Sequence, residues 1–151
     1  MYEQTLHQPR TVLDLVRPPS EQKLPVVLSV AEVRQILSCV SFLRYRACLG
    51  TIYACGLRIQ EGVHLQVKDI DAERGVIHIR NGKGGKDRYV PLPAPILKLL
   101  RRYWVTHHHP VWIFPSHWGA KGSPAQATKP MTVRGIQRAF QSALQESGIR
   151  K

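Results

Sequence analysis

The chain has 151 residues, 43% of them hydrophobic and 21% charged, as expected of one soluble globular domain with its own core. No apolar stretch approaches the roughly 18 to 20 residues that a membrane-spanning helix needs, and the N-terminal MYEQTLHQPR lacks the layout of a signal peptide, so we expect a cytoplasmic protein without a membrane partner. The net charge is +12, and from residue 76 onward 13 basic residues face 2 acidic ones, which favours a polyanionic partner over a merely solvated basic face.

The first 25 residues contain four prolines and predict a short helical start followed by a linker. The next element is a helix that begins after Ser29. Ser29 and Glu32 have the spacing of a capping box, and Leu28 and Val33 have the spacing of a hydrophobic staple. The apolar face of this helix continues through Val33, Ile36, Leu37 and Val40.

Two further helices are expected, one over residues 42–55 that ends at Gly56 and a short one over residues 57–65. After these helices, the apolar residues recur at every second position. Residues 76–80 and 87–92 alternate apolar and polar side chains around a glycine-rich turn and predict a β-hairpin, with Pro91 at its end.

The second half ends in two helices separated by a long loop. Pro95 can start a helix whose apolar face holds Ile96, Leu99, Leu100 and Tyr103, and residues 105–130 form the loop. The last helix follows a Thr132 cap and ends at Gly148. Its apolar positions are Ile136, Ala139, Phe140, Ala143 and Leu144.

Two motifs carry side chains suited to binding a phosphate. Arg58 and Glu61 are three apart on one helix face, which is usually an exposed ion pair but also suits an arginine held by its glutamate to grip a phosphate. The turn Gly82-Lys83-Gly84-Gly85-Lys86-Asp87-Arg88 has more glycine and charge than a turn requires. A nucleotide-binding P-loop does not fit, because Asp87 and a strand follow Lys86 where Ser or Thr and a helix would be needed.

No metal or disulfide is expected. His107, His108, His109 and His117 have no cysteine or carboxylate near them in sequence, so a solvated loop is the favoured interpretation. The three cysteines, Cys39, Cys48 and Cys55, are an odd number in helix-like surroundings, which favours reduced, buried thiols.

Taken in chain order, these segments resemble the tyrosine recombinase (phage integrase) family. The matching stretches are KLPVVLSVAEV at 23–33, YACGLRIQE at 53–61, VKDID at 67–71, GKGGKDRYVPL at 82–92 and IFPS at 113–116. Arg17-Pro18-Pro19 and Glu61-Gly62 are most similar to integron-type and transposon-associated integrases, so the resemblance implies a bacterial cytoplasmic protein of a mobile element that acts on double-stranded DNA.

The family cuts DNA by transesterification, in which a tyrosine attacks a phosphodiester and keeps the bond energy in a phosphotyrosyl link, so no cofactor or metal is implied. By this resemblance Arg58 is the first catalytic arginine and Glu61 orients it. Lys83 is the general acid that protonates the leaving 5′-oxygen. Lys86 and Arg88 grip the DNA backbone nearby.

The chain also departs from the family pattern. After a segment like Gly148-Ile149 the family continues into a His-x-x-Arg motif and the tyrosine nucleophile, whereas this sequence ends at Arg150-Lys151, so no nucleophile is assigned. Residues 1–22 resemble the tail and linker of a core-binding domain, and residues 23–151 resemble the N-terminal part of the catalytic domain. That part implies an α+β, mainly α fold with helices around a small antiparallel sheet. Gly62 replaces a more usual leucine, at a cost of about 1 kcal/mol in helix propensity.

We therefore expect a DNA-binding fragment of a DNA integration and recombination protein that is inactive in strand cleavage when alone. The alternative is a non-catalytic DNA-binding or partner-binding remnant of a decayed integrase that pairs with an intact recombinase. Unburied apolar faces on residues 42–55 and 132–147 would favour self-association. Lys83→Ala separates the two interpretations, because it removes cleavage in the first and changes only affinity in the second.

Overall fold

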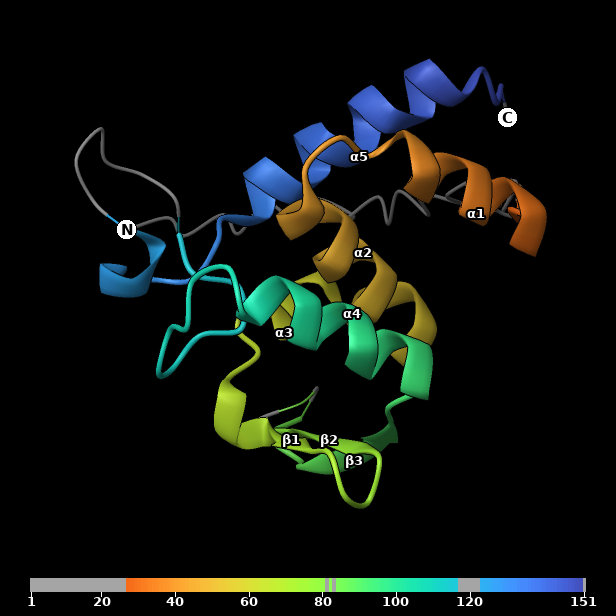
Figure 1. Ribbon diagram of the computed structural model, residues 1–151. Helices are drawn as coiled ribbons and strands as arrows, with labels where there is room; N and C mark the ends of the chain where they lie inside the picture. The colour runs from red at the N-terminus through yellow and green to blue at the C-terminus, as the bar shows by residue number, and fades with distance from the viewer. Residues whose placement is uncertain (1–26, 81, 83, 117–122, 151) are drawn as a thin grey trace, which may run out of the picture.

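The computed structural model describes residues 27–80, 82, 84–116 and 123–150, and Figure 1 shows its helices gathered on one side of a small antiparallel sheet. The helices are α1 (Val30–Cys39), α2 (Leu43–Cys55), α3 (Ile59–Val63), α4 (Ala94–Trp104) and α5 (Val133–Ser147), with short 3-10 turns η1 (Val67–Asp69) and η2 (Pro124–Gln126). The strands are β1 (Ile70–Asp71), β2 (Val76–Ile79) and β3 (Arg88–Pro91), in the order β1-β2-β3. The expected α+β, mainly α class is confirmed.

The helix ends follow the expected local signals. The Ser29 hydroxyl accepts a hydrogen bond from the Glu32 amide at 3.3 Å, and the Glu32 carboxylate accepts one from the Ser29 amide at 2.7 Å, which completes the capping box. Gly56 (φ 61°) and Gly148 (φ 70°) adopt the left-handed conformation that ends α2 and α5. At the start of α5, the Thr132 hydroxyl accepts from the Gly135 amide at 3.2 Å.

Two elements differ from expectation. The third helix covers only Ile59–Val63, because Arg58 has extended backbone (φ −70°, ψ 152°) and serves as its N-cap. The sheet has a strand that the hairpin prediction missed, β1, in which Ile70 pairs with Ile77 and Asp71 with Val76. Two residues are too few to show an alternating pattern, so only the pairing with β2 identifies this strand.

The main core lies where α2, α3 and α4 meet the sheet. Its most deeply buried large side chains include Phe114, Ile77, Leu100, Ile136 and Val63. A smaller cluster joins α1 to α5 through Ile36, Val40 and Ala143. The faces of residues 42–55 and 132–147 are covered in large part, because α2 packs against α4, α3 and α5, and α5 packs against α1 (Figure 1). Phe42 and Tyr53 remain 61% and 51% exposed, so the predicted exposure of the 42–55 segment holds at these two residues.

Two histidines of the loop after α4, His107 and His109, are buried, which corrects the expectation of solvated side chains for these two, whereas His108 is exposed. His109 is 4% exposed, and its Nδ1 accepts hydrogen bonds from the Val111 and Trp112 amides at 3.1 and 2.8 Å. Nε2 of the same ring lies 2.8 Å from the Ala127 carbonyl oxygen. His107 is also buried, and its Nδ1 accepts from the His109 amide. His117 lies outside the described residues.

Candidate functional site

Arg58 and Glu61 lie at the start of α3, immediately after the left-handed turn at Gly56. Arg58 is the N-cap, and its backbone amide donates to the Glu61 carboxylate Oε2 at 2.7 Å. The Arg58 Nη1 donates to Oε1 of the same carboxylate at 3.0 Å. The N-cap position of Arg58 and the first-turn position of Glu61 therefore hold both side chains at the start of α3.

A second arginine, from β3, contacts the same carboxylate. Nη1 of Arg88 lies 2.8 Å from Oε1 of Glu61, and Nη2 lies 2.8 Å from Oε2, a two-pronged pairing of guanidinium and carboxylate. The Glu61 side chain is only 10% exposed, whereas that of Arg88 is 35% exposed and that of Arg58 is 55% exposed. One nearly buried carboxylate thus accepts hydrogen bonds from two guanidinium groups that are both more exposed than it is.

This arrangement keeps Glu61 ionised. The pKa of Glu61 is lowered from its ordinary 4.5 to about 2. The side-chain hydrogen bonds from Arg88 are the largest cause, the backbone and side chain of Arg58 also lower this pKa, and burial opposes them. In return, the carboxylate raises the pKa of Arg88 above its ordinary value. At neutral pH the three groups together therefore carry a net charge of +1.

The arginines border a pocket of about 350 Å³. Its lining residues are Gly56, Leu57, Arg58, Lys86, Asp87 and Arg88. Three of these are cations and one is an anion, and the Asp87 carboxylate lies 3.1 Å from Nε2 of His78 on β2. A guanidinium has five N–H donors, and Arg58 uses one nitrogen on Glu61, so it retains donors for an anion at this pocket.

Gly82, in the glycine-rich turn, lies close to Arg88. The Gly82 amide donates to the Lys86 carbonyl at 3.0 Å, and Gly84 (φ 82°) and Gly85 (φ 71°) have left-handed backbone. A Cβ atom on Gly82 would lie 2.8 Å from the Lys86 carbonyl oxygen and 3.0 Å from Nη1 of Arg88. Lys83, the predicted general acid, lies outside the described residues.

The structure therefore brings Arg58, Glu61, Lys86 and Arg88 together at one site. The contact between Arg88 and Glu61 was not predicted. The two residues are 27 apart in sequence, and no local pattern connects a strand residue to the first turn of a distant helix. The only signal was the position of both residues in segments that already pointed to phosphate binding.

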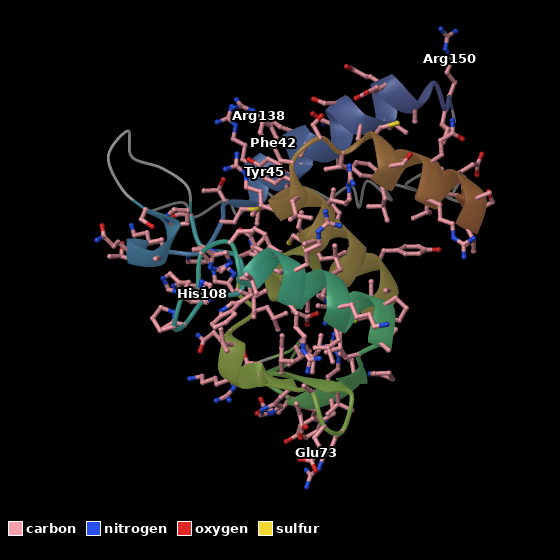
Figure 2. The ribbon with its side chains drawn as sticks, in the orientation of Figure 1. Phe42, Tyr45, Glu73, His108, Arg138 and Arg150 are labelled. Atoms are coloured by element: carbon pink, nitrogen blue, oxygen red, sulfur yellow. The ribbon has the colours of Figure 1, made fainter. Side chains whose placement is uncertain are left out.

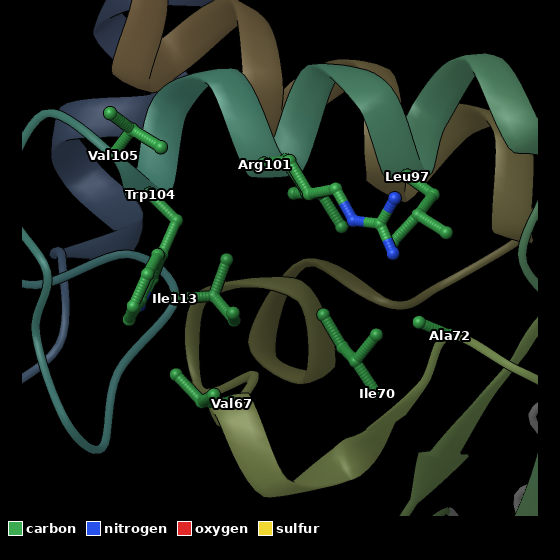
Figure 3. Close-up of a pocket in the computed structure, with 9 residues that line it drawn as sticks. Val67, Ile70, Ala72, Leu97, Arg101, Trp104, Val105 and Ile113 are labelled. Atoms are coloured by element: carbon green, nitrogen blue, oxygen red, sulfur yellow. The ribbon is translucent and has the colours of Figure 1, made fainter.

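A second hollow has a different character. Below α4, a pocket of about 430 Å³ is lined by apolar side chains of α4, η1, β1, the β1–β2 turn and the loop after α4, and Arg101 is the one charged residue among them (Figure 3). An apolar hollow with one charge does not suit an anionic ligand as the Arg58 pocket does. Within the part of the chain that the structure describes, no three His, Cys, Asp or Glu side chains are grouped so as to hold a metal ion, and no helix is long and apolar enough to cross a membrane.

Comparisons with known proteins place these residues in a wider context. Residues 27–151 match the family model described as the phage integrase family. The chain is 40% identical over 154 residues to y4eF of Sinorhizobium fredii, described as a candidate integrase/recombinase, covering 93% of this chain and 61% of that protein. It is 30% identical over 171 residues to an Escherichia coli integrase/recombinase, covering 91% of this chain and 50% of that protein. The chain thus spans about half to three fifths of the length of these relatives.

Solved structures share the fold. The crystal structure of XerA recombinase is similar with a TM-score of 0.68 and 24% identity, covering 89% of this chain and 48% of that one. A post-cleavage complex of the site-specific recombinase XerH with a palindromic difH substrate is similar with a TM-score of 0.65 and 26% identity, covering 87% of this chain and 38% of that one.

Proposed function

Because this chain belongs to the phage integrase family, we propose that it supplies part of the phosphate-activating site of a site-specific DNA recombinase. Its substrate is the phosphodiester of double-stranded DNA. Arg58 binds the non-bridging oxygens of the scissile phosphate and stabilises the charge that builds up as the phosphorus becomes pentacoordinate. Glu61 holds the Arg58 guanidinium in place, and Lys86 binds a neighbouring phosphate.

The remaining chemistry follows the family's transesterification. A tyrosine hydroxyl, from a segment beyond this sequence, loses its proton to water, and its oxygen forms a bond to phosphorus while the bond from phosphorus to the 5′-oxygen breaks. Lys83 gives its proton to that departing oxygen, which leaves as a 5′-hydroxyl. A second arginine, from the same outside segment, shares the phosphate charge with Arg58.

The observation that most supports this proposal is the contrast between Arg58 and Glu61. Glu61 is 10% exposed and fixes the arginine, while the arginine is 55% exposed and borders a pocket with two further cations. An ordinary surface ion pair leaves both partners exposed and contributes little to stability. A guanidinium that is fixed by a carboxylate on one side and exposes its remaining N–H donors to a pocket is suited to bind a phosphate.

The test joins residues 1–151 to the C-terminal part of y4eF, the 40% identical relative, and challenges the chimera with a nicked suicide substrate that carries the relative's recombination site. We expect a covalent adduct between protein and DNA, and none from residues 1–151 alone. Arg58→Ala and Lys83→Ala are expected to remove the adduct. Arg74→Gln is the matched control, because Arg74 lies in the turn between β1 and β2, at the opposite end of β2 from the glycine-rich turn.

Lys83→Ala also separates the alternative interpretation. If this variant changes only DNA affinity and the adduct still forms, a non-catalytic DNA-binding or partner-binding role is favoured instead. If the chimera binds DNA but never forms an adduct, with Arg58 and Lys83 intact, the proposed chemistry is wrong for this chain.

A further inference from the structure

The hydrogen bonds around Glu61 indicate a role for Arg88 other than direct contact with DNA. Both terminal nitrogens of Arg88 are engaged with Glu61, each at 2.8 Å. Arg58 contacts the same carboxylate through one side-chain nitrogen at 3.0 Å. Arg88 therefore makes the two-pronged contact, and Arg58 makes the single one, which keeps most of the Arg58 donors available.

This division depends on competition for one carboxylate. If Arg88 were absent, the carboxylate would lose two of its four close donors, and Arg58 would be its only remaining guanidinium partner among the described residues. Glu61 is nearly buried, so leaving its oxygens without donors is costly. Arg58 would then turn its second terminal nitrogen onto Glu61 and away from the pocket.

Arg88 also supports the start of the glycine-rich turn. Gly82 rests so closely on the pair that a Cβ atom there would lie 3.0 Å from Nη1 of Arg88 and 3.9 Å from Oε1 of Glu61. Lys83 follows Gly82 directly. The same ion pair thus contacts both the helix that carries Arg58 and the turn that carries Lys83.

We propose that Arg88 is a positioning residue: it occupies both oxygens of Glu61, so that Arg58 keeps a single contact with the carboxylate and presents its other donors to the phosphate. This inference rests on the proposed function for its phosphate. It replaces direct DNA contact as the role of Arg88. In this proposal the Glu61 carboxylate, through its ion pair with Arg88, connects α3 to the β2–β3 turn.

The experiment reads the Arg58 side chain directly, in the full 151-residue chain. The Nε–H signal of Arg58 in a nitrogen–proton NMR spectrum is assigned from its disappearance in Arg58→Lys. The signal is followed without DNA and during titration with a short double-stranded DNA oligonucleotide. We compare wild type, Arg88→Gln, Arg88→Lys and the double variant Glu61→Gln/Arg88→Gln, with thermal unfolding to confirm that each is folded.

Without DNA, Arg88→Gln is expected to shift the Arg58 signal, because Arg58 becomes the main partner of Glu61. With DNA, about fivefold more oligonucleotide is expected to be needed for half of the Arg58 response. The double variant is expected to recover much of that response, since no carboxylate remains to hold Arg58 back. Arg88→Lys keeps the charge but not the fork and should fall in between.

Arg80→Gln is the matched control. Arg80 also pairs with a nearly buried carboxylate, that of Asp69, at 2.7 Å, and this carboxylate is not the one that Arg58 and Arg88 share. It should leave the Arg58 signal without DNA unchanged. A purely structural effect of losing an arginine would instead appear in both variants.

Two outcomes would overturn the inference. If Arg88→Gln leaves the DNA-free Arg58 signal unchanged, Arg88 does not position Arg58. If the double variant is weaker than Arg88→Gln, Arg88 acts on the DNA and not through Glu61. The proposed function fails differently, namely if the wild-type Arg58 signal does not respond to DNA, while the DNA-free comparison still decides the role of Arg88.

Discussion

Gly62 follows Glu61 in α3 and lies against Ile52 of α2. A Cβ atom at position 62 would lie 2.4 Å from Cγ1 and 2.7 Å from Cδ1 of Ile52, so the isoleucine fills the space that a side chain would need. Glycine lowers the helix propensity of α3 at this position, but its lack of a side chain allows α3 to lie close to α2. Because Glu61 is the neighbouring residue, this contact also sets how α3 presents the arginine pair.

We expect Gly62→Leu to lower the free energy of unfolding by about 1 to 3 kcal/mol, because the added side chain overlaps Ile52. The measurement is urea unfolding. The double variant Ile52→Ala/Gly62→Leu removes side-chain volume from α2 and adds it to α3, so it should recover part of the lost free energy of unfolding. If the double variant is less stable than the sum of the two single changes predicts, the space at Gly62 is not what limits this position.

Glu61 predicts a specific dependence of stability on pH. Its pKa is lowered to about 2 in the folded chain, so its contribution is fully present above the ordinary 4.5 and is lost as pH falls toward 2. Solvent around the two arginines weakens the pair, and we expect the contribution to be on the order of 1 to 2 kcal/mol.

Urea unfolding of wild type and Glu61→Gln at pH 7, 4.5, 3 and 2 measures this contribution. The stability difference between the two proteins should be largest at pH 7 and should shrink steadily below pH 4.5. A difference that stays constant down to pH 2 would mean that the Glu61 charge does not stabilise the fold.

At the scale of elements, the loop after α4 is tied to the core by His109. Its ring accepts from two backbone amides through Nδ1, so Nε2 carries the proton and donates to the Ala127 carbonyl. One buried ring thus joins the start of the loop to the segment near η2. This explains how a segment rich in turn residues keeps Ile113 and Phe114 in the core.

We expect His109→Ala to lower the free energy of unfolding by about 2 to 4 kcal/mol, since three backbone groups lose their partner and a cavity is left. Thermal unfolding measures the loss, and amide exchange at Val111 and Trp112 locates it. His108→Ala is the control, because His108 is exposed in the same loop. Equal effects of the two variants would contradict the tethering role of His109.

The parts of the fold that were predicted from sequence are those specified by neighbouring residues. The capping box at Ser29 and the left-handed glycine at Gly56 depend on backbone within a few residues, so a short stretch of sequence reveals them. The contact between Glu61 and Arg88 depends on how the hairpin packs against α3, and β1 depends on its partner strand. Such features follow from tertiary packing and leave no periodic pattern.

At the scale of the whole molecule, α1 and α5 lie side by side at the end opposite the sheet (Figure 1), and Figure 2 shows Arg138 of α5 far from Glu73 in the turn between β1 and β2. Ile36, Val40 and Ala143 are each 2% exposed or less where the two helices meet. The α1–α5 contact therefore leaves this part of the α5 face unavailable for self-association.

The charge distribution predicts how the whole chain binds DNA. Thirteen basic residues from residue 76 onward should make the logarithm of DNA affinity fall linearly with the logarithm of salt concentration, by about 0.9 for each phosphate neutralised. Lys86 lines the Arg58 pocket, so Lys86→Gln should flatten that slope by about 0.9 and weaken binding to different DNA sequences to the same extent.

Arg74→Gln carries the same loss of charge at the opposite end of β2, which is four residues long, and provides the comparison. If the pocket faces the DNA, Arg74→Gln should leave the slope unchanged while Lys86→Gln reduces it, as measured by fluorescence anisotropy with a short duplex between 50 and 300 mM salt, roughly the range in which such slopes are large. Equal slopes for the two variants would mean that only net charge attracts DNA and that the pocket at Arg58 has no fixed place in the complex.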